Sequence, residues 1–179
     1  MRALSLVAAA TTDFPEPNVV LVRRAWNAGA PTFGLDDREY IQRQPEKGLI
    51  TKQEVRAVTL ARLQLRPNSV VWDIGAGSGS VGLEAARLCP QGHVWAIEKN
   101  AEDYAIAQRN HASVGVSNDT WANGKDPKGM DDGPAHDDNI IGGSGGELGE
   151  LITLALARLR TGGQLGMNFI TFENLATDT

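Results

Sequence analysis

The densest group of residues that could bind a ligand is the run Asp73-Ile74-Gly75-Ala76-Gly77-Ser78-Gly79. It directly follows the apolar residues 70–72, which predict a buried strand. Glycine has no Cβ, so a glycine loop can turn sharply and approach a ligand closely. A helix that begins just after the loop would point unpaired N–H groups and a partial positive charge at the same place. The sequence therefore predicts a nucleotide-cofactor site at the carboxyl end of this strand.

The spacing of the glycines indicates which cofactor. Dinucleotide sites favour Gly-x-Gly-x-x-Gly, whereas this loop reads Gly-x-Gly-x-Gly and is followed by Ser80. An acid lies two residues before the first glycine, and this pattern resembles that of S-adenosylmethionine (SAM) methyltransferases, which hold no pyrophosphate. The alternative is a strand–helix turn that binds nothing. The expected SAM-binding residues of the loop are Asp73, Gly75, Ala76, Gly77, Ser78 and Gly79.

Glu98 is a second candidate for the cofactor. It ends the apolar run 93–98 and lies 25 residues after Asp73. A carboxylate at the end of the second strand can accept hydrogen bonds from both ribose hydroxyls. Methyl transfer from a sulfonium needs no nucleophile and base, because alignment of an electron-rich carbon supplies much of the rate. No catalytic acid or base is identified.

The remaining polar clusters are less specific. The glycine run 142–146 lacks the Lys-Ser/Thr of a phosphate-binding loop. A substrate-facing role for Gly143, Ser144 and Gly145 and a plain flexible turn both stay open. The three histidines (residues 93, 111 and 136) are scattered without metal-ligand spacing, so no metal site is expected.

Alternating strands and helices must position these residues. We expect a helix from Thr51, strands at 69–74 and 93–98, helices at 81–88 and 101–112, a strand near Trp121, a strand at 139–141, a helix at 147–160 and a strand at 164–171. Such alternation requires right-handed crossovers and parallel strands. The predicted fold class is α/β, a Rossmann-like, class I methyltransferase fold with a mostly parallel, doubly wound sheet and its C-terminal strands missing.

Two helices carry finer predictions. Thr51 and Glu54 have the spacing of a capping box at the start of the first helix. The expected apolar stripe of that helix is Val55, Val58, Leu60, Leu63 and Leu65. The expected inner face of the last helix is Leu148, Leu151, Ile152, Ala155, Leu156 and Leu159, with a cap at residues 162–163.

Composition fits one soluble globular domain. The chain has 179 residues, 41% of them hydrophobic, and a net charge of −5, which argues against a general nucleic-acid binder. No stretch approaches the roughly 20 apolar residues of a membrane helix. Cys89 is the only cysteine, so no internal disulfide can form, and we expect a cytoplasmic protein. Residues 1–33 read as an N-terminal arm, with a short strand at 18–22, or as the tail of a preceding module; residues 34–179 read as the SAM-binding domain.

Five stretches together are similar to one family. The stretches are Gly34-Leu35-Asp36-Asp37-Arg38-Glu39-Tyr40, Leu49-Ile50-Thr51-Lys52-Gln53-Glu54-Val55-Arg56, Trp72 to Val81, Ala96-Ile97-Glu98-Lys99-Asn100 and Ile141 to Leu148. They resemble the carbon-15 methyltransferase (decarboxylating) of cobalamin biosynthesis, which occurs alone or as the C-terminal half of precorrin-6Y C5,15-methyltransferase. The resemblance covers about residues 33–175.

This resemblance implies a chemistry and further site residues. The activity would be SAM-dependent methylation of carbon 15 of a precorrin-6 type tetrapyrrole with loss of carbon dioxide from an acetate side chain. It implies SAM contacts at Thr51, at the glycine loop, at Glu98 and at Asp126. Because precorrins carry many carboxylates, Lys52 and Arg56 are candidate substrate partners; solvated helix charges are the alternative. A homo-oligomer and a fusion to a carbon-5 methyltransferase module are both open. Another small-molecule substrate and a truncated, non-catalytic remnant are the alternative functions.

Three features depart from the family pattern. Residues 124–128 read Gly-Lys-Asp-Pro-Lys where Gly-x-Ala-Pro-Glu is usual. Asn139 occupies an expected apolar strand position. The sequence stops soon after the fifth strand, where a helix and two more strands would follow in the family, and this predicts that the fifth strand is an unprotected edge.

Overall fold

The computed structural model describes residues 8, 11–13, 31–43, 50–124, 134–142 and 148–168. The chain divides into two compact units, residues 1–30 and 31–179, and all the helices and strands named below belong to the second. The strand expected at 18–22, the candidate cofactor residue Asp126 and the candidate substrate residues 143–145 lie outside the described residues.

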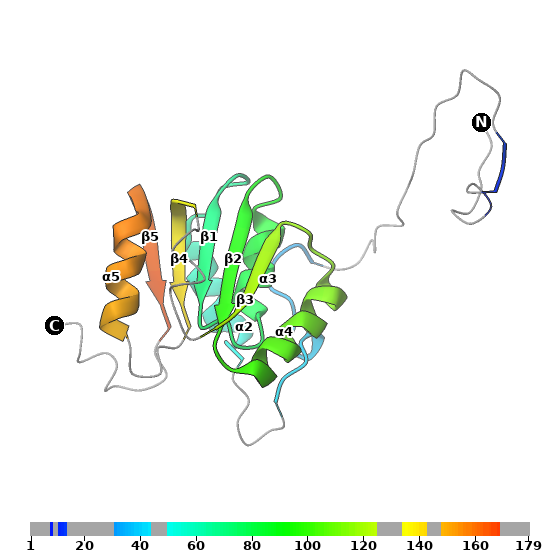
Figure 1. Cartoon of the computed structure of the whole chain (residues 1–179), viewed down its shortest axis with the longest axis horizontal. Helices are drawn as coiled ribbons and strands as arrows, with labels where there is room; N and C mark the ends of the chain where they lie inside the picture. Colours follow the sequence, from blue (N-terminus) through cyan, green and yellow to red (C-terminus); the bar gives the residue numbers. More distant parts are fainter. Residues whose placement is uncertain are drawn as a thin grey trace. The chain divides into compact units, whose positions relative to one another are not determined.

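Five parallel strands form one sheet in the order β3-β2-β1-β4-β5 (Figure 1). The strands are β1 (Val70–Ile74), β2 (His93–Glu98), β3 (Asp119–Asn123), β4 (His136–Ile141) and β5 (Leu159–Met167). The chain moves outward from β1 to β2 and β3, then crosses back to β4 on the other side of β1. The order therefore reverses between β1 and β4, where open α/β sheets bind ligands. The predicted α/β doubly wound class is confirmed.

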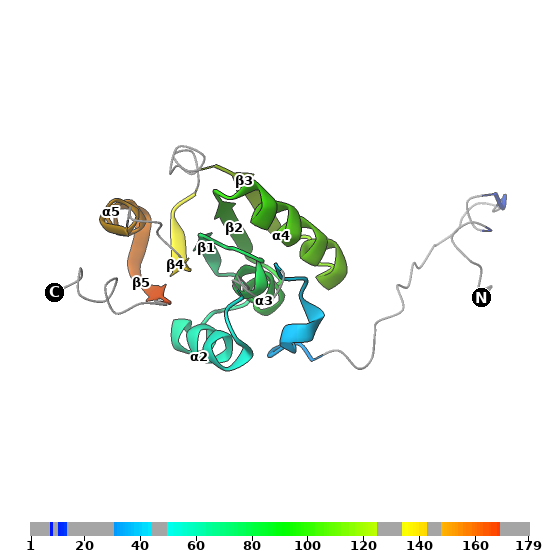
Figure 2. The same cartoon turned by 90° about the horizontal axis from the view of Figure 1, so that it is seen from below.

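Helices cover both faces of the sheet. Figure 2 shows α2 (Gln53–Leu63), α3 (Ser80–Leu88) and α4 (Ala101–Val114) on one face and α5 (Leu148–Arg158) on the other. A short 3₁₀ turn, η1 (Asp37–Glu39), precedes α2. Across the described part of the chain, no helix has both the length and the apolar character that a membrane span requires.

The core has a layer on each side of β1. Val71 packs with Leu60 of α2 and Val81 of α3, whereas Trp72 packs with Leu148 and Leu151 of α5. Side chains alternate between the two faces of a strand, and both faces are covered here, so β1 must be apolar throughout. This burial explains why residues 70–72 and Ile74 are apolar, and it makes the buried Asp73 an exception that needs its own explanation.

The start and the inner face of α2 differ from the prediction. The residue before the helix is Lys52, and it makes no side-chain capping bond, so the expected capping box of Thr51 and Glu54 is wrong. Val55 and Val58, expected in the apolar stripe, are 48% and 60% exposed. The buried positions of α2 are Arg56, Thr59, Leu60 and Leu63. The helix is therefore rotated so that a charged residue faces α3, because that arginine has a buried partner there.

The boundary between α5 and β5 also differs from the prediction. The helix ends at Arg158 and β5 begins at the next residue, so Gly162 and Gly163 lie within the strand and do not cap the helix. Pairing with β4 shifts register at this point. A Cβ on Gly163 would lie 2.4 Å from the Asp137 carbonyl oxygen, so the glycine permits close approach of the two strands. Leu156, expected on the inner face of α5, is 54% exposed.

Candidate cofactor site

The glycine loop after β1 has the backbone conformation that only glycine adopts easily. Gly75, Gly77 and Gly79 have φ angles of +70°, +56° and +80°. At such angles a side chain strains the backbone. The N–H groups of Gly75 and Ala76 both donate to the Ile97 carbonyl oxygen, at 3.0 and 3.1 Å. These bonds fix the loop to the carboxyl end of β2, beside Glu98.

Glu98 lies against the glycine loop. Its Oε2 accepts a hydrogen bond from the Gly77 N–H at 2.8 Å, and its Oε1 accepts one from the Asn100 N–H at 2.7 Å. The residue is only 6% exposed. Each carboxylate oxygen has two acceptor sites, so each retains one for a ligand. The structure thus brings together the two motifs that the sequence placed 21 residues apart, and it orients the carboxylate with backbone donors.

Asp73 lies behind the loop and not on its open side. The residue is 1% exposed. Burial raises the pKa of its carboxyl group from 3.8 to about 7; the backbone N–H of Gly82 partly opposes this shift, and the nearby Glu98 carboxylate adds to it. A Cβ on Gly82 would lie 2.5 Å from Asp73 Oδ2, so the first turn of α3 packs directly on the carboxyl group. Asp73 therefore joins β1 to the start of α3, beneath the loop.

The loop after β4 meets the glycine loop at the switch point of the sheet. Gly142 N–H donates to the Ile74 carbonyl oxygen at 2.9 Å. A Cβ on Gly142 would lie 2.8 Å from the Gly75 carbonyl oxygen. The glycine run 142–146 therefore begins in contact with the cofactor loop. Gly142, the residue before the predicted substrate residues, therefore lies at the edge of the candidate site.

Arg56 is a structural residue, which corrects the expectation that it faces a substrate. Its side chain is fully buried, and its guanidinium contacts Glu84 Oε1 at 2.6 Å and Asp37 Oδ1 at 3.2 Å. It also donates to the carbonyl oxygens of Leu35 and Thr51. A guanidinium with these partners has no free face for a substrate carboxylate. A buried cation needs paired acceptors, and Glu84 on α3 supplies the charge.

Thr51 and Lys52 lie next to this buried pair. The Thr51 carbonyl oxygen accepts a bond from Arg56 Nη1 at 2.6 Å, so the arginine fixes the backbone at a predicted cofactor contact. The Lys52 side chain is 64% exposed, and its Nζ lies 3.7 Å from Asp37 Oδ2. Such an exposed pair is weak, so the Lys52 ammonium group stays available to an anionic ligand.

Two residues that the sequence analysis did not assign to the site support the loop. Asn110 of α4 is fully buried, and its amide donates to the Ser78 carbonyl oxygen at 2.8 Å. Trp121 of β3 packs on Gly79, where an added Cβ would lie 2.6 Å from the indole ring. The sequence gives one indication of Asn110: it lies four residues after the apolar Ile106, and therefore on the inner face of the same helix.

The loop carries polar groups that a bound cofactor could satisfy. Ser78 is 5% exposed, and its Oγ has no hydrogen-bond partner among the described residues, so the loop carries an unmet polar group. Gly79, the residue before α3, has no side chain that could cap the helix. Within the described ranges, no group of three His, Cys, Asp or Glu side chains could hold a metal ion.

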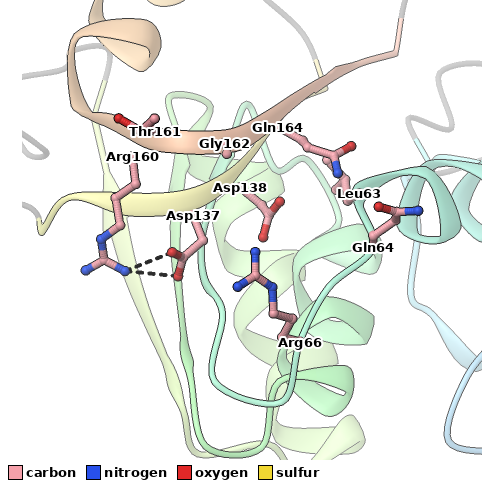
Figure 3. Close-up of a pocket in the computed structure, with 10 residues that line it drawn as sticks. Leu63, Gln64, Arg66, Asp137, Asp138, Arg160, Thr161, Gly162 and Gln164 are labelled. Atoms are coloured by element: carbon pink, nitrogen blue, oxygen red, sulfur yellow. Dashed lines mark hydrogen bonds and ion pairs between the residues drawn. The ribbon is translucent and has the colours of Figure 1, made fainter.

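A separate cavity of about 260 Å³ lies at the opposite end of the sheet. Figure 3 shows Arg66 and Asp138 pointing into it, beside the ion pair of Arg160 and Asp137. It is bordered by the irregular start of β5. None of the predicted cofactor residues that the structure describes lines this cavity, so it is distinct from the site at the glycine loop.

The strand order, the glycine loop after β1 and the acid at the end of β2 define a Rossmann-like, class I SAM methyltransferase fold. Residues 44–178 match the precorrin methyltransferase domain family, and the chain belongs to that family.

Three relatives illustrate the likeness. The chain is 40% identical over 160 residues to a precorrin-6Y C(5,15)-methyltransferase (decarboxylating) from a Sinorhizobium species, covering 87% of this chain and 38% of that protein. It is 40% identical over 126 residues to a cobalt-precorrin-6B C(15)-methyltransferase (decarboxylating) from Salmonella typhimurium, covering 70% and 65%. The crystal structure of a precorrin-6y C5,15-methyltransferase from Geobacter metallireducens superimposes with a TM-score of 0.78 at 41% identity, covering 83% and 77%. The chain thus spans less than two thirds of the two curated relatives.

Proposed function

We propose that this protein is a cytoplasmic, SAM-dependent C-methyltransferase of cobalamin biosynthesis. Its reaction would methylate carbon 15 of a precorrin-6 type tetrapyrrole and remove carbon dioxide from an acetate side chain. Support comes from family membership over residues 44–178. The names of two relatives also include both methyl transfer and decarboxylation. A homo-oligomer or a fusion to a carbon-5 module stays a prediction.

The observation that carries the proposal is the contact between Gly77 and Glu98. A carboxylate held 2.8 Å from the glycine-loop N–H is fixed at the carboxyl ends of β1 and β2, where this fold binds nucleosides. Bound SAM supplies a methyl group on a positively charged sulfur. The residues proposed to hold it are Thr51, Gly75, Ala76, Gly77, Ser78, Gly79, Glu98 and Asp126. Asp73, which the sequence predicted among them, is buried behind the loop and supports it from there.

The chain's own residues would contribute alignment and charge. Glu98 retains one acceptor site on each oxygen for two adjacent hydroxyl groups. The amino end of α3 faces the same loop and favours an anionic group such as a carboxylate. Lys52 is exposed and weakly paired, so we retain it as a contact for substrate carboxylates. Gly142 lies against Gly75, and we propose that residues 143–145, which follow it in the sequence, face the substrate.

The test is a turnover assay with the purified chain, SAM and a precorrin-6 type substrate. Mass spectrometry should show one methyl group gained and one carbon dioxide lost, together with S-adenosylhomocysteine (SAH). SAM binding with methylation only of some other small acceptor would contradict the substrate assignment. Absence of SAM binding at high micromolar concentration would contradict the whole proposal and favour the non-catalytic alternative.

A further inference from the structure

The segment Gly34–Arg43, here called the strap, is bonded to α3, to α4 and to the turn after β2. At its start, the N–H groups of Gly34 and Leu35 donate to the two carboxylate oxygens of Glu84 on α3, at 2.9 and 3.1 Å. At its end, Arg43 Nε lies 2.7 Å from Asp103 Oδ1 on α4. Arg43 also donates to the side chain of Asn100, whose own N–H is bonded to Glu98. The strap thus runs from α3 to the turn that holds the ribose-binding candidate.

Asn110 is the side chain that joins the strap to the glycine loop directly. Its Oδ1 accepts the Ile41 N–H at 2.7 Å, and its Nδ2 donates to the Ile41 carbonyl oxygen at 3.0 Å. The same Nδ2 donates to the Ser78 carbonyl oxygen at 2.8 Å. The residue has no exposed surface. The Asn110 amide group therefore donates two hydrogen bonds and accepts one. Its partners, Ile41 and Ser78, lie 37 residues apart in the sequence.

The chemistry of this position favours asparagine. It must donate to two carbonyl oxygens and accept from one N–H, which a carboxylate, a hydroxyl group or an apolar side chain cannot do together. A buried carbonyl or N–H that loses its partner is costly, so the strap and the loop are each more stable when the other is in place. Any ligand that orders the loop must then also order the strap, because the coupling of two such equilibria is reciprocal.

We propose that Asn110 is a positioning residue that couples the strap to the SAM-binding loop, so that cofactor binding and strap order stabilise each other. This inference rests on the proposed function, because it takes the glycine loop as the cofactor site. Asn110 would thus affect cofactor binding although it lies outside the glycine loop and the end of β2. The strap would contribute to cofactor affinity through this residue.

The chain offers a matched control in Asn118. Its Nδ2 also donates to two carbonyl oxygens, those of Ala86 and Cys89, at 3.0 and 2.7 Å, but at the far end of α3. Asn110→Ala and Asn118→Ala should both lower the thermal unfolding temperature. Calorimetric titration with SAH, well below that temperature, should give a Kd at least tenfold weaker for Asn110→Ala and within twofold of wild type for Asn118→Ala.

A second measurement needs no variant. In the wild-type chain, saturating SAH should slow hydrogen exchange of the Ile41 N–H at least tenfold, because that N–H is bonded to Asn110. Equal Kd values for the two variants, or unchanged Ile41 exchange in a chain that does bind SAH, would overturn the coupling alone. A wild-type chain that binds no SAH would instead overturn the proposed function, and this inference with it.

Discussion

The Gly77 N–H donates to Glu98 Oε2 across 2.8 Å, and this bond joins the loop after β1 to the end of β2. Gly77 has a φ of +56°, so the direction of its N–H depends on a conformation that glycine adopts without strain. The carboxylate is oriented by this bond and by the Asn100 N–H. The geometry of the candidate ribose contact is therefore set by the backbone before any ligand arrives.

Replacing Gly77 by valine should abolish SAH binding, because a branched side chain at positive φ strains the loop and occupies ligand space. Isothermal titration measures the loss. Gly162→Val is the matched control: its φ is +84°, a Cβ there meets no atom within 4 Å, and it lies in β5. The control should lose stability and keep its SAH affinity. Retained affinity in Gly77→Val would contradict the loop assignment.

Glu98→Gln should weaken SAH binding by about 1–3 kcal/mol, because charge-assisted hydrogen bonds become neutral ones and one acceptor oxygen is lost. Titration of wild type and variant gives the difference directly. Glu150→Gln, an exposed position on α5, removes the same charge away from the site and should leave the affinity unchanged. An equal affinity for Glu98→Gln and wild type would show that this carboxylate serves only the protein.

Gly82→Ala should destabilise the fold, because the new methyl group would lie 2.5 Å from Asp73 Oδ2 in a packed interior. We expect a loss of about 1–3 kcal/mol in the free energy of unfolding by urea. Gly149→Ala in α5 meets no atom and should instead gain about 0.5–1 kcal/mol from helix propensity. Equal changes in the free energy of unfolding for Gly82→Ala and Gly149→Ala would contradict the packing of Asp73 against α3.

The pKa of Asp73 makes a signed prediction for stability. The folded chain holds a proton there up to about pH 7, whereas the unfolded chain releases it near pH 4. The stabilisation from this group is therefore complete below about pH 4 and is lost as the pH rises to 7, by roughly 4 kcal/mol at most.

Asp73→Asn mimics the protonated group and should remove this dependence. Urea unfolding at several pH values should show the variant gaining stability relative to wild type from pH 4 to 7, with no further change above. His136, whose pKa burial lowers to about 4, contributes an opposite slope to both proteins and cancels in the difference. Parallel stability profiles for the two proteins would rule out a raised pKa.

The local patterns that predicted well were those that tertiary contacts do not alter. The strand of residues 93–98 and the start of the helix at Ala101 match the structure, because a buried parallel strand must be apolar and Asn100 provides an N-cap. The third strand near Trp121 is confirmed as β3, and the weak strand at 139–141 is confirmed but begins earlier, at His136.

The predictions that failed concern residues whose burial depends on a partner far away in the sequence. Arg56 reads as a surface charge in the sequence, but Glu84, 28 residues later, makes its burial favourable and turns Val55 and Val58 outward. Asn139 occupies a strand position where the sequence analysis expected an apolar residue. It is fully buried, with its amide nitrogen 3.2 Å from His136 Nε2 and its Oδ1 without a partner among the described residues. No spacing rule in one sequence specifies such pairs.

The most direct test of the account is a crystal structure of the chain with SAH. The adenosine should lie at the carboxyl ends of β1 and β2, with the ribose hydroxyls on Glu98 and the backbone of Gly75–Gly79 beside the ligand. Density for SAH in the cavity bordered by Arg66 and Asp138, or no bound SAH at saturating concentration, would contradict the central claim.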